Sequence, residues 1–145
     1  MYDHVLLPTD GSDGTERVAE NAIHLARENG ATLHVLHVVD TDVLPVDPHS
    51  RRLADELEAA GRASMAAIHD RAAEAGVYCV EALRYGSPAD EILTYADEYD
   101  VDVVVIGTHG RHGVRRALIG SVTERVVRFS EVPVLTVRTL PIDAE

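Results

Sequence analysis

One stretch of the sequence combines the residue types that bind phosphate groups. Three glycines lead into a short run that carries two hydroxyls: Gly107, Gly110, Gly120, Ser121, Val122 and Thr123. Glycines let backbone N–H groups approach an anion closely, and the first amides of a helix that begins at Ser121 have no partner inside that helix. Those amides and the helix dipole together favour a phosphate group. The hydroxyls of Ser121 and Thr123 can add hydrogen bonds.

The same stretch is basic in an otherwise acidic chain. The sequence has 25 acidic residues against 13 basic ones and a net charge of −12, and every basic residue is an arginine. Residues 107–128 hold one acidic residue, Glu124, and five of the arginines: Arg111, Arg115, Arg116, Arg125 and Arg128. Arg111 can present a planar guanidinium to a phosphate. Two interpretations stay open: these arginines bind an anionic ligand, or they neutralise neighbouring acidic helices.

The residues from Ser121 to Glu124 also have the spacing of a capping box. In that arrangement Ser121 caps the helix and the Glu124 side chain reaches back to the first amide. Such a cap contributes about 1 kcal/mol with no ligand present. The two roles are compatible, because a serine oxygen carries one donor hydrogen and two lone pairs.

A second segment with polar side chains follows the first apolar run. It reads Pro8-Thr9-Asp10-Gly11-Ser12. In open parallel sheets, ligands bind beyond the carboxyl ends of strands where the strand order reverses. We therefore expect Asp10 to contact a ligand, although it can also cap the first helix. His34 and His37 show no convergent ligand cluster and are expected to be structural. Cys79 lies in an apolar strand and is expected to be an inert buried thiol.

The elements that must position these residues alternate along the chain. The apolar patterns predict strands at 4–8, 32–39, 77–84, 103–106 and 134–138, and helices at 12–29, 51–75, 87–99 and 121–130. Ser87 and Pro88 have the residue types of a helix cap and a first helical position. This alternation predicts one α/β domain over residues 1–145, with an open parallel sheet and right-handed crossovers.

Several function classes do not fit the sequence. It has no loop ending in Gly-Lys-Ser/Thr and no dinucleotide G-x-G-x-x-G spacing. A response-regulator receiver is disfavoured because the chain has no lysine. The net charge disfavours nucleic acid as a partner.

No apolar run approaches the roughly 18 residues of a membrane span. The single cysteine and the absence of a signal-peptide pattern predict a cytoplasmic protein. The lysine-free acidic composition suggests adaptation to a salty cytoplasm.

The sequence resembles the universal stress protein family. The nucleotide signature of that family is G-x2-G-x9-G-[S/T], and it is met here by Gly107, Gly110, Gly120 and Ser121. Further segments also match: LLPTDGSDG near the start, LHVVD, GSPADEIL, and VPVLTVR near the end. The resemblance covers essentially the whole chain.

The resemblance implies a Rossmann-like fold of the adenine nucleotide alpha hydrolase type, with strand order 3-2-1-4-5 and helices on both faces of the sheet. It implies that ATP, with Mg²⁺, lies between the first and fourth strands. Pro8, Thr9, Asp10 and Val38 would contact the adenosine end. The glycines would let the loop close over the phosphates, and Ser121, Val122 and Thr123 would hold them. Ile106, His109 and Arg111 complete the candidate set.

The resemblance also implies a regulatory protein of stress adaptation that forms a homodimer through the last strand, from Val134 to Arg138. Two alternatives are a scaffold module of the same fold that binds no nucleotide, and a slow ATPase. The sequence shows no assembled set of general base, arginine finger and metal carboxylates, which phosphoryl transfer uses. We therefore expect little or no turnover.

Overall fold

The computed structural model describes residues 1–10, 15–43, 50–109 and 120–139. Gly110 and Arg111 of the candidate set lie outside these residues, as do Gly11, Ser12, Arg115 and Arg116.

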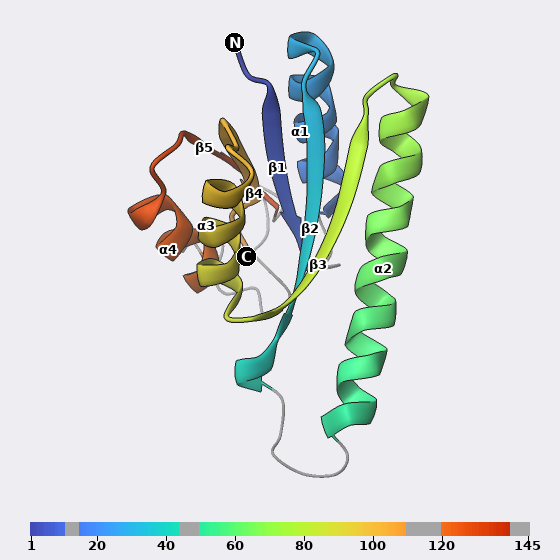
Figure 1. Cartoon of the computed structure of the whole chain (residues 1–145), viewed down its shortest axis with the longest axis vertical. Helices are drawn as coiled ribbons and strands as arrows, with labels where there is room; N and C mark the ends of the chain where they lie inside the picture. The colour runs from blue at the N-terminus through green and yellow to red at the C-terminus, as the bar shows by residue number, and fades with distance from the viewer. Residues whose placement is uncertain (11–14, 44–49, 110–119, 140–145) are drawn as a thin grey trace, which may run out of the picture.

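The core of the fold is a five-stranded parallel sheet with the order β3-β2-β1-β4-β5, which confirms the expected topology (Figure 1). Its strands are β1 (His4–Thr9), β2 (Thr32–Asp40), β3 (Cys79–Gly86), β4 (Val103–Gly107) and β5 (Val134–Val137). β1 pairs with β2 on one side and with β4 on the other. The strand order therefore reverses between β1 and β4, where ligand sites form in sheets of this type.

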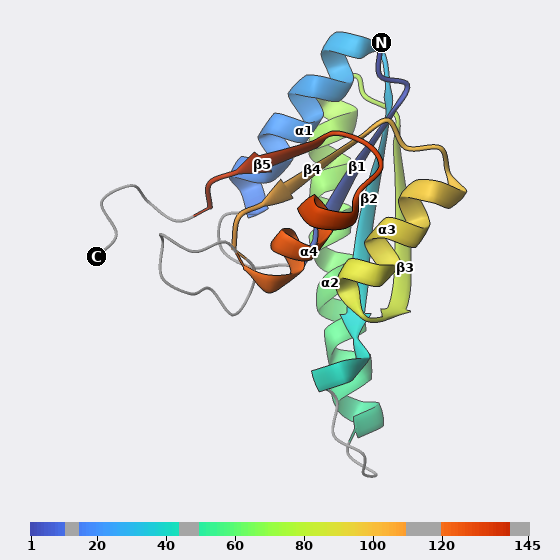
Figure 2. The ribbon, with the colours of Figure 1, turned by 90° about the vertical axis from the view of Figure 1, so that its left-hand side faces the viewer.

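Helices cover both faces of the sheet (Figure 2). They are α1 (Thr15–Asn29), α2 (Ser50–Glu74), α3 (Pro88–Glu98) and α4 (Ser121–Phe129), and a short 3-10 turn, η1 (Thr41–Val43), follows β2. Successive strand residues point to opposite faces. Val5 and Leu7 pack under α1 and α2, whereas Leu6 packs under α3 and α4. The sheet is thus buried on both sides, as its continuous apolar strands predict.

The observed boundaries differ from the expected ones at a few ends. β3 begins at Cys79 and runs to Gly86, because its whole length pairs with β2, from Leu33 opposite Cys79 to Asp40 opposite Gly86. The buried residues of α2 lie from the middle of the helix onward, at Gly61, Met65, Ile68 and Ala72. In Figure 1 the first turns of α2 extend past the carboxyl ends of the strands, so the expected apolar stripe is only partly covered.

The start of α3 confirms the predicted positions of Ser87 and Pro88. Ser87 is the N-cap residue and Pro88 opens the helix. The Ser87 hydroxyl makes no capping bond and instead donates to the Asp42 carboxylate of η1, at 2.7 Å. The cap side chain therefore ties α3 to the turn after β2.

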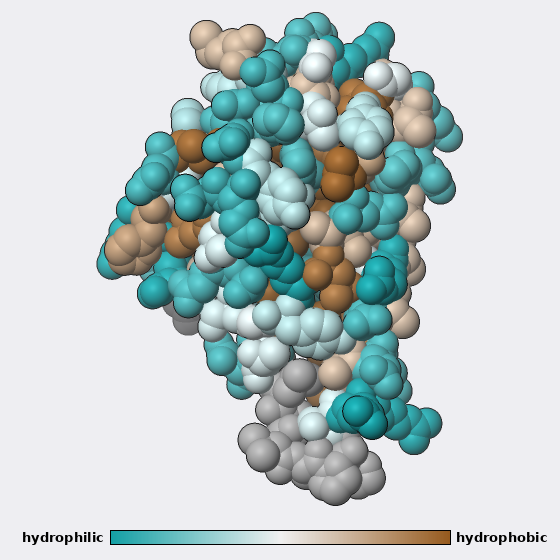
Figure 3. Space-filling view, viewed as in Figure 1, coloured by the Kyte–Doolittle hydropathy of each residue, from teal (hydrophilic) through white to brown (hydrophobic). Residues whose placement is uncertain are grey.

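The surface combines polar and apolar side chains. The face seen in Figure 3 is mostly hydrophilic, with apolar patches scattered between polar side chains. Within the described ranges, no helix has the length and the hydropathy that crossing a membrane requires.

Candidate functional site

A cavity of about 250 Å³ opens where the strand order reverses. The carboxyl ends of β1, β2 and β4 and the first turn of α4 form its walls. Each described residue of the candidate set lines it: Pro8, Thr9, Asp10, Val38, Ile106, Gly107, His109, Gly120, Ser121, Val122 and Thr123. The fold therefore brings four separate segments of the sequence to one place.

The start of α4 differs from the predicted capping box. Gly120 is the N-cap residue, with φ −61° and ψ 154°, and Ser121 is the first helical residue. The Glu124 amide donates to the Gly120 carbonyl at 2.9 Å, and the Glu124 carboxylate accepts from Arg128 at 2.6 Å. The capping-box prediction was wrong because the extended glycine moves the cap one residue toward the N-terminus. Gly120 has no side chain to accept from the first amides, and the Ser121 side chain is exposed.

Thr123 joins the start of α4 to the end of β4. Its hydroxyl donates to the Gly107 carbonyl at 2.6 Å, and the residue is buried. The Gly120 amide donates to the Thr108 carbonyl at 2.7 Å. The two ends of the glycine loop are therefore held together. Because the Thr123 hydroxyl hydrogen is used here, its backbone N–H and the oxygen lone pairs are what Thr123 can offer a ligand.

Gly107 is a glycine for a packing reason. A Cβ at this position would lie 2.6 Å from Cγ2 of Thr139 and 3.2 Å from Cγ2 of Val18. Its φ is not in the left-handed region, since the positive-φ glycines of the described residues are Gly30, Gly76 and Gly86. The first glycine of the signature thus leaves room for neighbouring side chains as well as for any ligand.

The cavity has an apolar part and a polar part. Val38, Ile92 and Ile106 contribute apolar surface, and Asp10 and Asp40 contribute carboxylates. The first amides of α4 add a positive end of a helix dipole to the same space. Such a lining fits a ligand with a flat apolar group at one end and an anionic group at the other.

Two arginines of the basic stretch are engaged with acidic side chains. Arg125 lies 3.3 Å from Asp90 of α3, and Arg128 lies 2.6 Å from Glu124 of its own helix. For this pair the neutralising interpretation holds. Arg111, Arg115 and Arg116 lie outside the described residues. No group of three His, Cys, Asp or Glu side chains in the described ranges is placed to hold a metal ion.

The sequence matches the universal stress protein family over residues 1–138. It is also 34% identical to universal stress protein MJ0531 of Methanocaldococcus jannaschii over 141 residues, which is 95% of this chain and 83% of that protein. The chain belongs to the universal stress protein family.

Solved structures agree with this membership. The hypothetical protein MJ0577 superposes with a TM-score of 0.87 at 28% identity, covering 97% of this universal stress protein and 99% of the other chain. A universal stress protein solved in complex with cAMP gives a TM-score of 0.71 at 28% identity, with 96% and 98% of the two chains covered. One from Archaeoglobus fulgidus in complex with dAMP gives 0.67 at 25% identity, covering 93% and 97%.

The cavity of this universal stress protein is also lined by residues that the sequence did not single out as ligand contacts, among them His37, Leu57 and Thr139. His37 was expected to be structural, and its Nδ1 does donate to the Thr9 carbonyl at 2.9 Å, because a carbonyl oxygen can only accept. The ring packs against α2 at Gly61, where a Cβ would overlap it. An isolated glycine inside a helix costs about 1 kcal/mol relative to alanine, so Gly61 was the available signal for this contact.

Proposed function

We propose that this universal stress protein binds ATP, accompanied by Mg²⁺, in the cavity between β1 and β4, and that it acts as a dimeric regulatory protein of stress adaptation. The observation that carries the proposal is the joining of an apolar wall and the first turn of α4 in one cavity. The cAMP and dAMP complexes of related proteins support an adenine nucleotide as the ligand class. The triphosphate is the further step that the proposal adds.

The residues present fit the parts of such a ligand. The amides of Ser121, Val122 and Thr123 and the exposed Ser121 hydroxyl would receive phosphate oxygens. Val38 and Ile106 would border the adenine, and the Asp10 carboxylate would accept from ribose hydroxyls. These assignments rest on the shared cavity, which each of these residues lines.

The cation would accompany the nucleotide and would not occupy a protein cage. Mg²⁺ usually keeps several waters and binds through one or two carboxylates and the substrate phosphates. Asp10 and Asp40 are the carboxylates that the described part of the cavity offers. We therefore expect Mg²⁺ to strengthen ATP binding and to bind weakly without ATP.

Isothermal titration calorimetry tests the proposal. Wild-type protein titrated with Mg-ATP at high salt should show saturable heat. High salt is needed because the net charge of −12 repels ATP, and screening at molar salt shortens that repulsion to about 3 Å. Heat no greater than that of dilution would reject nucleotide binding and favour the scaffold alternative.

A pair of matched variants tests the position of the phosphates. Ser121→Asp places a negative charge at the start of α4, where it favours the helix but repels phosphate. Ser121→Asn has nearly the same shape without the charge. We expect Ser121→Asp to weaken ATP binding at least about tenfold, roughly 1.4 kcal/mol, relative to Ser121→Asn. Adenosine should bind both variants equally. Equal ATP affinity in the two variants would exclude phosphate at α4.

Hydrolysis of the bound ATP is tested separately from binding. We propose that hydrolysis is slow or absent, and phosphate release from Mg-ATP by the purified protein measures it. Release well above the buffer background, and lost in Ser121→Asp, would favour the ATPase alternative.

We infer that the homodimer forms through the β5 edge of the sheet. β5 pairs with β4 on one side, and Leu135 is 42% exposed on it. An uncovered edge strand is a template for pairing with another chain. Sedimentation velocity should find a dimer that Leu135→Arg dissociates. Tyr78→Arg beside the opposite edge strand, where Tyr78 is 72% exposed, is the control and should remain dimeric.

We also propose a cytoplasmic location, in agreement with the free cysteine Cys79.

A further inference from the structure

Thr139 connects the chain that leaves β5 to the beginning of the glycine loop. It lies two residues beyond the end of β5 and lines the cavity. Its hydroxyl accepts from the His109 amide at 3.2 Å and donates its hydrogen to the His109 carbonyl at 3.3 Å. Its own amide donates to the Thr108 hydroxyl oxygen at 3.3 Å. One side chain and its amide thus hold two consecutive loop residues.

The methyl group of Thr139 is part of the same contact. It occupies the space beside Gly107, where an added Cβ would come within 2.6 Å of it. Gly107 and Thr139 are therefore a sterically matched pair. The glycine permits the close approach, and the threonine fills the space that the glycine leaves.

Residues 107–109 are held from two sides. On the α4 side, the Thr123 hydroxyl donates to the Gly107 carbonyl at 2.6 Å and the Gly120 amide donates to the Thr108 carbonyl at 2.7 Å. On the β5 side, the Thr108 amide donates to the Val137 carbonyl at 2.9 Å, and Thr139 makes the contacts described above. A ligand that presses on this segment from the cavity therefore acts on both α4 and the end of β5.

We propose that Thr139 is a positioning residue that fixes residues 107–109 and thereby couples nucleotide binding in the cavity to the end of β5 and the two residues that follow it. The inference rests on the proposed function, because the coupling requires nucleotide in the cavity. Coupling between two sites is reciprocal, so if nucleotide stabilises the ordered end of β5 by some factor, ordering of that end strengthens nucleotide binding by the same factor. β5 is at the edge of the sheet, so the coupling reaches the surface of the molecule.

Three threonine variants separate positioning from direct ligand contact. Thr139→Val keeps both branches of the side chain but removes the hydroxyl, Thr139→Ser keeps the hydroxyl, and Thr94→Val makes the same change at an exposed position of α3. Without nucleotide, amide exchange measured by NMR should become faster at Thr108 and His109 in Thr139→Val alone. Unchanged exchange in Thr139→Val would overturn the role of Thr139 in fixing the loop.

ATP affinity is the second readout. We expect Thr139→Val to weaken ATP binding about fivefold, as for the loss of roughly one net hydrogen bond. Thr139→Ser and Thr94→Val should stay close to wild type. ATP should slow exchange at the Thr139 amide in the wild type. Equal affinities of Thr139→Val and Thr94→Val, or no effect of ATP on that amide, would overturn the coupling.

A suppressor experiment tests the matched pair without any ligand. Gly107→Ala should destabilise the protein to urea, because its methyl meets Cγ2 of Thr139. Adding Thr139→Ser removes that Cγ2 and should restore part of the stability, whereas adding Thr139→Val should not. If the wild type binds no nucleotide, the proposed function and the coupling fail, whereas the exchange and suppressor results still decide whether Thr139 fixes the loop.

Discussion

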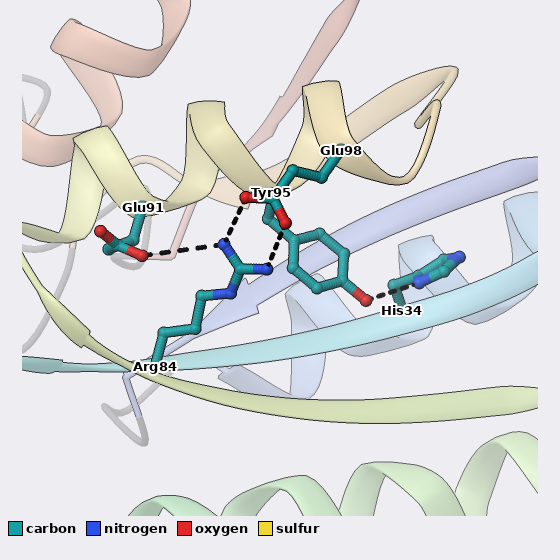
Figure 4. A network of polar contacts seen from close by, with 5 residues as sticks. All are labelled: His34, Arg84, Glu91, Tyr95 and Glu98. Atoms are coloured by element: carbon teal, nitrogen blue, oxygen red, sulfur yellow. Dashed lines mark hydrogen bonds and ion pairs between the residues drawn. The ribbon is translucent and has the colours of Figure 1, made fainter.

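His34 of β2 and Tyr95 of α3 form a buried hydrogen bond, with 2.7 Å between His34 Nδ1 and the Tyr95 hydroxyl oxygen (Figure 4). The other ring nitrogen of His34, Nε2, lies 3.0 Å from Nδ1 of His4 on β1. Arg84 of β3 lies over the Tyr95 ring at 5.0 Å and binds the Glu98 carboxylate through two nitrogens, at 3.2 and 3.0 Å. These contacts join three strands to α3.

The His34 side chain makes stability depend on pH. Burial lowers the pKa of His34 below 6.5, and the neighbouring His4 lowers the same pKa further. The other polar rings around it are Tyr95 and Tyr99, both from α3. In the unfolded chain His34 takes up a proton near its ordinary pKa of about 6.5, while in the folded protein it does so only at lower pH. The contribution of neutral His34 to stability is therefore complete above the unfolded pKa of about 6.5, and it is lost as pH falls from there toward the folded pKa.

Urea unfolding at about pH 7.5 and about pH 5.5 measures this dependence, since the second value lies below the pKa of an unfolded histidine. The free energy of unfolding should be lower at the acidic value. His34→Gln should flatten the difference, because glutamine does not titrate. His24→Gln on the exposed face of α1 is the control and should keep the wild-type slope. The same slope in all three proteins would remove His34 as the cause.

Tyr95→Phe should destabilise the fold through one hydroxyl group. Tyr95 is 1% exposed, so removal of its hydroxyl leaves His34 Nδ1 without this buried partner. The expected loss is about 1–3 kcal/mol in the free energy of unfolding. Tyr99→Phe is the control: Tyr99 is 48% exposed, and loss of its hydroxyl should change stability little. Equal effects in the two variants would contradict a specific role for the His34–Tyr95 bond.

Gly61→Ala should lower the stability of the protein, although alanine has a higher helix propensity than glycine. In most helices this change stabilises by about 1 kcal/mol. Here the added methyl overlaps the His37 ring, so the ring must move away from the Thr9 carbonyl. We expect lower stability by urea unfolding in the wild-type background. In a His37→Ala background the same change should stabilise, and a destabilisation there would show that some other contact requires Gly61.

The Cys79 thiol should be unreactive in the native state. Burial is the main reason that its pKa is raised to about 11, with a smaller contribution from Glu81. At about pH 8 roughly one thiol in a thousand would then be ionised, and the thiolate is the nucleophile. A thiol reagent should label the protein slowly in buffer and rapidly in urea. Fast labelling of the native protein would mean that β3 opens at that position.

Sequence alone determined the order of strands and helices along the chain. Apolar periodicity is a local property, and this chain alternates cleanly between strand and helix patterns. Sequence also determined the family, because Gly107, Gly110, Gly120 and Ser121 keep a fixed spacing. The candidate residues could be named because loops at the carboxyl ends of parallel strands meet at one edge of the sheet.

Tertiary structure decided what these residues contact. The capping box was compatible with the sequence, and only the extended conformation of Gly120 moved the cap to that residue. The contacts of Thr139 with residues 107–109 and of His37 with Gly61 join segments about thirty and about twenty-four positions apart. Such contacts leave no periodic signal, because they depend on how far each strand and helix extends and on which side chain fills a neighbouring gap.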